Sequence, residues 1–206
     1  PTFDVVAPGI AKHEEEIVLA PGADPKSDPC LALRAAVAAA EFGLPIAPGT
    51  LQNLKSCPID DRTWNDESRS LFLRLLASGP ALLQVWEEID FVDIPGRLIP
   101  EWLAIRNRPS ASAAHRYTID RHSVEVVTRL GRETPRGNRY DDRHYQALLL
   151  AGILHDVGKR PGVADHAAEG ARHASMVLKR MGFDRDIIWW VTLLVREHLT
   201  LSEFAT

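Results

Sequence analysis

Four segments after residue 110 carry start and stop signals of α-helices, and this succession constrains the fold more than any other feature. Each segment begins at a polar residue that can cap a helix, and the first three are followed by a glycine that can end one. No alternating strand pattern occurs in this half. The second half is therefore predicted to be a helical bundle, with helices at Thr118–Leu130, Asp141–Val157, Asp165–Met181 and Asp184–Leu199.

The first half is expected to combine a small β-hairpin with further helices. Two short apolar runs, Val5–Ile10 and Glu16–Ala20, flank a polar turn and predict the hairpin. Residues 44–62 hold three prolines and little periodicity, so we expect them to be irregular. Capping and periodicity signals predict three helices, one from Asp28-Pro29 to Gly43, one over Asn65–Ala77 and one beginning at Pro80.

Small and polar residues over 107–115 are typical of a linker. We therefore predict a helical connector with its hairpin over residues 1–110 and a helical domain over residues 111–206. The predicted fold class is mainly α. The chain of 206 residues is long enough for this arrangement to bury a substantial core.

Composition and charge exclude several functional classes. The longest apolar run is Ala147–Leu154, eight residues, whereas a membrane-spanning helix needs about 20, so no membrane partner is expected. The formal net charge of −4 argues against nucleic acid as a partner. The two cysteines, Cys30 and Cys57, form no disulfide framework or metal-binding pattern, which favours a cytoplasmic location.

The distribution of histidine points to chemistry in the second half, because seven of the eight histidines lie at or after His115. His155-Asp156 follows an apolar helix and precedes Gly158 and Lys159. Imidazole and carboxylate are both good ligands for divalent first-row metals. A structural alternative is a helix C-terminus at which His155 and Lys159 interact favourably with the helix dipole.

Three further histidines favour the metal interpretation. His122 is three and four residues from apolar positions, His198 is in register with apolar residues of the last helix, and His166 begins its helix one turn before Gly170. The small Gly170 permits close approach of another helix. Several inward-facing imidazoles without a common purpose would leave buried polar atoms unsatisfied. The other late histidines are expected at the surface or behind the ligands: His115, His144 and His173.

This pattern resembles the HD-domain phosphohydrolases, which are helical proteins whose divalent metals activate water against phosphate esters. The segment His155-Asp156-Val157-Gly158-Lys159 matches the motif that gives the superfamily its name. The flanking residues 100–102, 108–109, 115–122 and 194–199 are similar to the uridylyl-removing region of bifunctional uridylyltransferase/uridylyl-removing enzymes, which modify PII nitrogen-regulatory proteins of bacteria. The resemblance covers most of the chain.

Two features depart from that family pattern. The sequence contains no Gly-Ser dipeptide, so the nucleotidyltransferase domain is expected to be absent. Glutamine is an implied effector only through sensory domains that this chain lacks. The family places a last aspartate ligand shortly after the segment matching residues 202–206, so we expect an HD domain truncated at its C-terminal end.

The resemblance implies a site and a reaction. The metal ligands would be His122, His155, Asp156, His166 and His198, holding one or two ions of Mn, Fe, Mg, Co or Zn. Lys159 and Asp165 would be catalytic, Lys159 by offsetting phosphoryl charge and Asp165 by orienting His166 or accepting a proton. The substrate would be PII carrying UMP or AMP on a tyrosine. Alternatives are hydrolysis of a free nucleotide or alarmone, and a regulatory HD module without catalysis.

Overall fold

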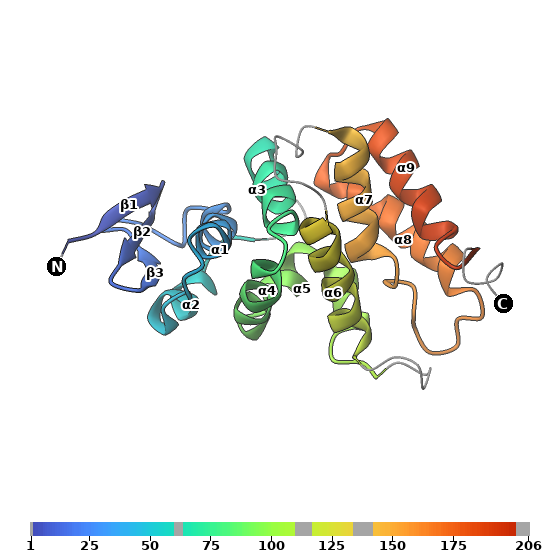
Figure 1. Cartoon of the computed structure of the whole chain (residues 1–206), viewed down its shortest axis with the longest axis horizontal. Helices are drawn as coiled ribbons and strands as arrows, with labels where there is room; N and C mark the ends of the chain where they lie inside the picture. The colour runs from blue at the N-terminus through green and yellow to red at the C-terminus, as the bar shows by residue number, and fades with distance from the viewer. Residues whose placement is uncertain (1, 60–63, 110–116, 134–141, 201–206) are drawn as a thin grey trace.

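The computed structural model describes residues 2–59, 64–109, 117–133 and 142–200. Within these ranges the chain is mainly α-helical, as predicted, and its elements follow one another along the long axis from the N-terminal sheet to the last two helices (Figure 1). In order they are β1 (Asp4–Ala7), β2 (Ile10–His13), β3 (Glu16–Leu19), α1 (Leu31–Phe42), α2 (Pro48–Leu54), α3 (Asp66–Leu76), α4 (Ala81–Phe91), α5 (Ile94–Leu98), the 3-10 helix η1 (Pro100–Ala104), α6 (Ile119–Glu133), α7 (Arg143–Leu154), α8 (His166–Met181) and α9 (Arg185–Arg196).

The predicted hairpin is extended by one strand to a three-stranded antiparallel sheet in the order β1-β2-β3. The run Val5–Ile10 is not one strand because the chain reverses within it at Pro8-Gly9. Gly9 has a φ of +75°, the left-handed conformation that glycine adopts without strain. The side chains of Ile10 and Ile17 are fully buried against α1 and attach the sheet to the helices.

The helices of the first half follow the predicted signals closely. The carboxylate of Asp28 accepts a hydrogen bond from the Cys30 N–H, and α1 ends at Gly43, which has a left-handed φ of +66°. Asn65 caps α3 in a reciprocal capping box with Ser68. The expectation of an irregular segment over residues 44–62 is wrong for α2, whose Pro48 occupies the first helical turn.

The predicted end of α6 at Gly131 is wrong, because this helix continues to Glu133. Gly131 serves helix packing instead. A Cβ atom at this position would lie 2.7 Å from the backbone nitrogen of Gly79, in the turn between α3 and α4. The other predicted helices of this half are present, but α7 ends at Leu154 and α9 at Arg196, each three residues earlier than predicted.

The two halves of the chain pack against each other through α3, α4, α6 and α7. Arg180 of α8 binds Glu101 of η1 through two ion-pair contacts of 2.7 and 2.5 Å. Arg69 of α3 donates a hydrogen bond of 2.9 Å to the carbonyl of Met181. The domain boundary that we predict near residue 110 lies next to residues 110–116, which are outside the described residues, and it stays a prediction.

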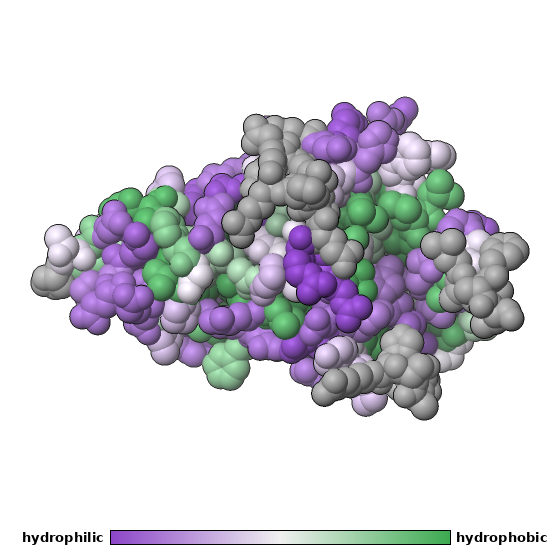
Figure 2. Space-filling view, viewed as in Figure 1, coloured by the Kyte–Doolittle hydropathy of each residue, from purple (hydrophilic) through white to green (hydrophobic). Residues whose placement is uncertain are grey.

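The surface mixes polar and apolar areas, and Figure 2 shows apolar patches over α9. The exposed apolar residues of this helix include Trp189, Leu193 and Leu194. Among the helices that the structure describes, none is both long enough and apolar enough to cross a bilayer. Both cysteines are buried and free, and burial raises the pKa of the Cys57 thiol to about 11.

Candidate metal centre

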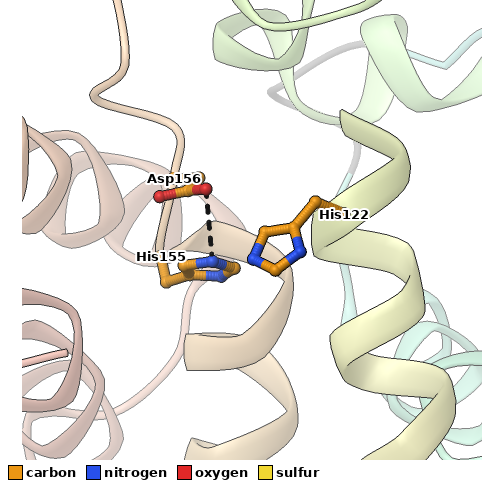
Figure 3. Close-up of side chains that lie close together, drawn as sticks. All are labelled: His122, His155 and Asp156. Atoms are coloured by element: carbon orange, nitrogen blue, oxygen red, sulfur yellow. Dashed lines mark ion pairs between the residues drawn. The ribbon is translucent and has the colours of Figure 1, made fainter. Parts of the chain in front are cut away.

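His155 and Asp156 lie at the C-terminal end of α7, where the helix stops and the chain turns. The apolar residues of α7 other than Leu148 are buried, so the position of this helix end is fixed by the core. Nδ1 of His155 lies 2.9 Å from the carbonyl oxygen of Gly152, which leaves Nε2 facing Asp156 Oδ2 at 3.3 Å. Figure 3 shows the imidazole turned toward this carboxylate.

His122 approaches this pair from α6. Its ring centroid is 5.2 Å from that of His155, and Figure 3 shows the two imidazoles side by side. Nitrogen and oxygen atoms of His122, His155 and Asp156 lie within 4.8 Å of one another, a spacing that allows one metal ion to contact all three. This is the first of two such groups among the described residues.

The second group contains Asp156 again, now with His166 of α8 and His198, which follows α9. Nδ1 of His198 is 2.7 Å from the carbonyl oxygen of Val195, so that Nε2 faces Asp156 Oδ1 at 3.6 Å. The ring centroids of His166 and His198 are 5.6 Å apart. Asp156 is therefore common to both groups, and the five residues predicted from the sequence meet in one place.

Two glycines bring the end of α7 against the start of α8. A Cβ atom on Gly158 would lie 2.3 Å from both the Gly170 nitrogen and the His166 carbonyl oxygen. A Cβ on Gly170 would lie 3.2 Å from the His155 carbonyl oxygen. This backbone contact places His166 near His155-Asp156, and it confirms the close approach predicted at Gly170.

Burial and neighbouring charges favour the protonation states of Asp156, His166 and His198 that bind a cation. Asp156 is 1% exposed. Burial alone would raise the pKa of its carboxyl, but the hydrogen bonds and charges of His155 and Lys159 hold that pKa well below its usual range. Burial lowers the pKa of His166 and of His198, which favours the neutral imidazole that binds metals.

Three buried atoms facing this cluster have no hydrogen-bond partner among the described residues: Asp156 Oδ1, His166 Nε2 and His198 Nε2. Such atoms are costly to bury unless something binds them. Imidazole nitrogens and a carboxylate oxygen are the donors that divalent first-row metals prefer. The residues therefore fit a metal ion.

The two residues predicted to be catalytic have different surroundings. Nζ of Lys159 is 2.8 Å from Asp156 Oδ2, at the edge of the metal cluster. Asp165 caps α8 and accepts a hydrogen bond of 2.9 Å from the Ala168 N–H. Capping accounts for an aspartate at this position, and the catalytic role of Asp165 stays a prediction.

Two of the remaining late histidines are among the described residues, and both lie outside the two groups. His144 is exposed on α7, as expected. His173 is buried, with Nε2 2.9 Å from Glu169 Oε1. His115 is outside the described residues.

A cavity of about 560 Å³ opens onto the cluster. Its lining contains the five candidate ligands and Lys159, together with two arginines, Arg108 and Arg160. Sequence reasoning missed both arginines, although Arg160 directly follows Lys159. Apolar side chains including Ile119, Val163 and Leu199 complete the walls.

Comparison with known proteins agrees with this geometry. Residues 119–203 match the family model of the HD domain, and these residues include every candidate ligand. The chain belongs to the HD-domain superfamily.

The sequence is also similar to particular members of the superfamily. It is 40% identical to the bifunctional uridylyltransferase/uridylyl-removing enzyme of Streptomyces coelicolor, over 98% of this chain and 24% of that enzyme. The enzymes of the same name from Mycobacterium tuberculosis and Corynebacterium glutamicum are 38% and 33% identical, over 96% and 87% of this chain and 24% and 25% of the enzymes. The chain thus spans about a quarter of the length of these relatives.

Proposed function

We propose that this chain hydrolyses a phosphodiester with the help of one or two divalent metal ions, and that it removes UMP or AMP from a tyrosine of a PII nitrogen-regulatory protein. The observation that carries the proposal is the convergence of four imidazoles on the buried carboxylate of Asp156. The relatives are named for uridylyl removal, which supports the nucleotidyl group as the part released.

His122, His155 and Asp156 would hold one ion, and Asp156 with His166 and His198 would hold a second one or complete the first. A divalent cation bound there supplies Lewis acidity and an activated water at neutral pH. The donor set accepts Mn, Fe, Co or Zn, and Mg less readily because Mg prefers oxygen ligands. Nδ1 of His155 and Nδ1 of His198 are fixed by backbone carbonyls, so that Nε2 of each ring faces the centre.

In the reaction that we propose, a water oxygen forms the new bond to phosphorus. The bond between phosphorus and the tyrosine oxygen breaks, and that oxygen takes up a proton as it leaves. Lys159, at the edge of the cluster, would offset the negative charge that builds on the phosphoryl oxygens. Asp165, adjacent to His166 in the sequence, would orient that imidazole or accept the proton released by water.

The function can be tested on the chain itself, loaded with Mn²⁺ and mixed with uridylylated or adenylylated PII. We expect free UMP or AMP to appear, as measured by chromatography, together with unmodified PII. If neither nucleotide is released while a free nucleotide or an alarmone is hydrolysed, the PII proposal is wrong and the small-molecule alternative replaces it.

Lys159→Ala should lower kcat for nucleotide release by about 100-fold, since charge stabilisation at a developing oxyanion is worth this much. The bound metal should remain, because no candidate ligand is removed. Lys179→Ala removes the same charge from an exposed position near the end of α8 and is the matched control, with kcat expected at the wild-type value. Equal kcat in the two variants would contradict the role of Lys159.

A further inference from the structure

Two arginines line the cavity without being metal ligands. Arg108 lies between η1 and α6, and Arg160 follows Lys159 in the loop between α7 and α8. Both side chains are half-buried. Their positions on different segments mean that the fold brings both guanidinium groups to the same space.

Neither guanidinium has a carboxylate partner among the described residues. Arg108 donates one hydrogen bond, of 3.2 Å, to the carbonyl of Ala104. Nε of Arg160 is buried and has no hydrogen-bond partner in the described part of the chain. By contrast, Arg106, two residues from Arg108, pairs with both Asp90 and Asp93. A half-buried guanidinium without an anionic partner is costly unless a ligand supplies the anion.

The net charge of the cavity lining also favours an anionic ligand. Among the described residues that line it, Arg108, Lys159 and Arg160 carry three positive charges and Asp156 carries one negative charge. A divalent ion at the histidines adds further positive charge. The phosphodiester that would be cleaved brings only one negative charge. Such a cavity attracts a ligand with more negative charge than that phosphodiester alone.

We propose that Arg160, together with Arg108, binds a second oxyanion of the substrate, separate from the phosphodiester that is cleaved. A guanidinium binds carboxylate or phosphate through paired N–H donors, so either group suits these side chains. This inference rests on the proposed function. The second oxyanion is then a carboxylate on the PII surface beside the modified tyrosine, or, for a free nucleotide, a second phosphate.

The test uses Arg160→Gln and Arg108→Gln, which keep a polar side chain but remove the charge. The matched control is Arg185→Gln, which removes the same charge from an exposed residue at the start of α9, opposite the end that precedes His198. Two substrates are compared by kcat/KM: nucleotidylated PII, and the p-nitrophenyl ester of UMP, which carries a single negative charge. Calorimetry separately compares the binding of UMP and UDP to each metal-loaded protein.

We expect Arg160→Gln to lose at least about tenfold more kcat/KM on nucleotidylated PII than on the p-nitrophenyl ester, because one charged hydrogen-bonded contact is worth about this factor. The loss should be in KM, and metal content should be unchanged. A selective loss of UDP binding relative to UMP, without selectivity on PII, supports a second phosphate as the oxyanion. Arg185→Gln should match the wild type throughout.

Equal losses on every substrate and ligand would overturn the inference, because the arginines would then act on the common phosphoryl group. Wild-type values in both cavity variants would overturn it as well. If the wild-type protein releases nothing from PII, the proposed function fails, but the comparison of UDP with UMP still decides whether Arg160 binds a second oxyanion.

Discussion

Asp156→Asn should reduce nucleotide release by at least about 1000-fold, since it weakens both candidate metal groups at once and with them the activation of water. The amide has the shape of the carboxylate but lacks its charge. Lys159 and the neighbouring imidazoles keep their places in the fold but lose the anion that joins them. The initial rate of UMP or AMP release, measured with saturating Mn²⁺, checks this expectation.

His144→Asn is the control for Asp156→Asn, because it alters an exposed polar residue of α7, the helix that precedes Asp156, away from both metal groups. We expect the control to release nucleotide at the wild-type rate. Asp156→Asn should still unfold in one cooperative transition on heating, which separates loss of the site from loss of the fold. A folded Asp156→Asn protein with more than about a tenth of wild-type activity would contradict a metal-centred reaction at this carboxylate.

Gly158→Ala has the second largest expected effect, and it acts through the backbone. The added Cβ would lie 2.3 Å from two backbone atoms of α8, and no flexible side chain can move aside to relieve the contact. We expect the free energy of unfolding to fall by about 3 kcal/mol. Metal affinity should fall too, because α8 must move and carries His166 with it. Urea unfolding and metal titration measure the two effects.

Gly49→Ala is the matched substitution for this test. Gly49 lies in α2 and has an ordinary φ, and an added Cβ would meet no atom of the described residues within 4 Å. Alanine is favoured over glycine inside a helix by about 0.5–1 kcal/mol, so this variant should be slightly more stable than the wild type. If both alanine variants unfold at the same urea concentration, the close contact between the end of α7 and the start of α8 is not as described.

The candidate ligands were predictable because helical periodicity reports which way a side chain faces. His122 lies one turn after the buried Ile119 on α6. His198 follows the end of α9 but continues the spacing of the buried Ile187 and Val191. The Gly170 signal predicted the close approach that brings His166 inward. The sharing of Asp156 by both groups was not predictable, since it depends on how α6, α8 and α9 converge on the end of α7. The position of Arg108 was not predictable either. It is far from Arg160 in the sequence, and only the folded structure shows that both line one cavity.

Errors in the predicted fold also have identifiable physical causes. Gly131 carries the usual signal of a helix end, but the contact with Gly79 gives that glycine a packing role inside α6. Pro48 is one of the three prolines that favour an irregular segment over residues 44–62, although proline is well suited to the first turn of a helix such as α2. Local signals identified both residues as important, but only tertiary contacts determined what each one does.

The most direct test of the central claim is the metal content of the wild-type chain after incubation with Mn²⁺, Fe²⁺, Co²⁺ or Zn²⁺ and removal of free ions, measured by elemental analysis. We expect about one or two tightly bound ions per chain for at least one of these metals, and loss of that binding in a folded Asp156→Ala variant. A wild-type chain that retains none of the four metals, or an Asp156→Ala variant that retains as much metal as the wild type, would contradict it.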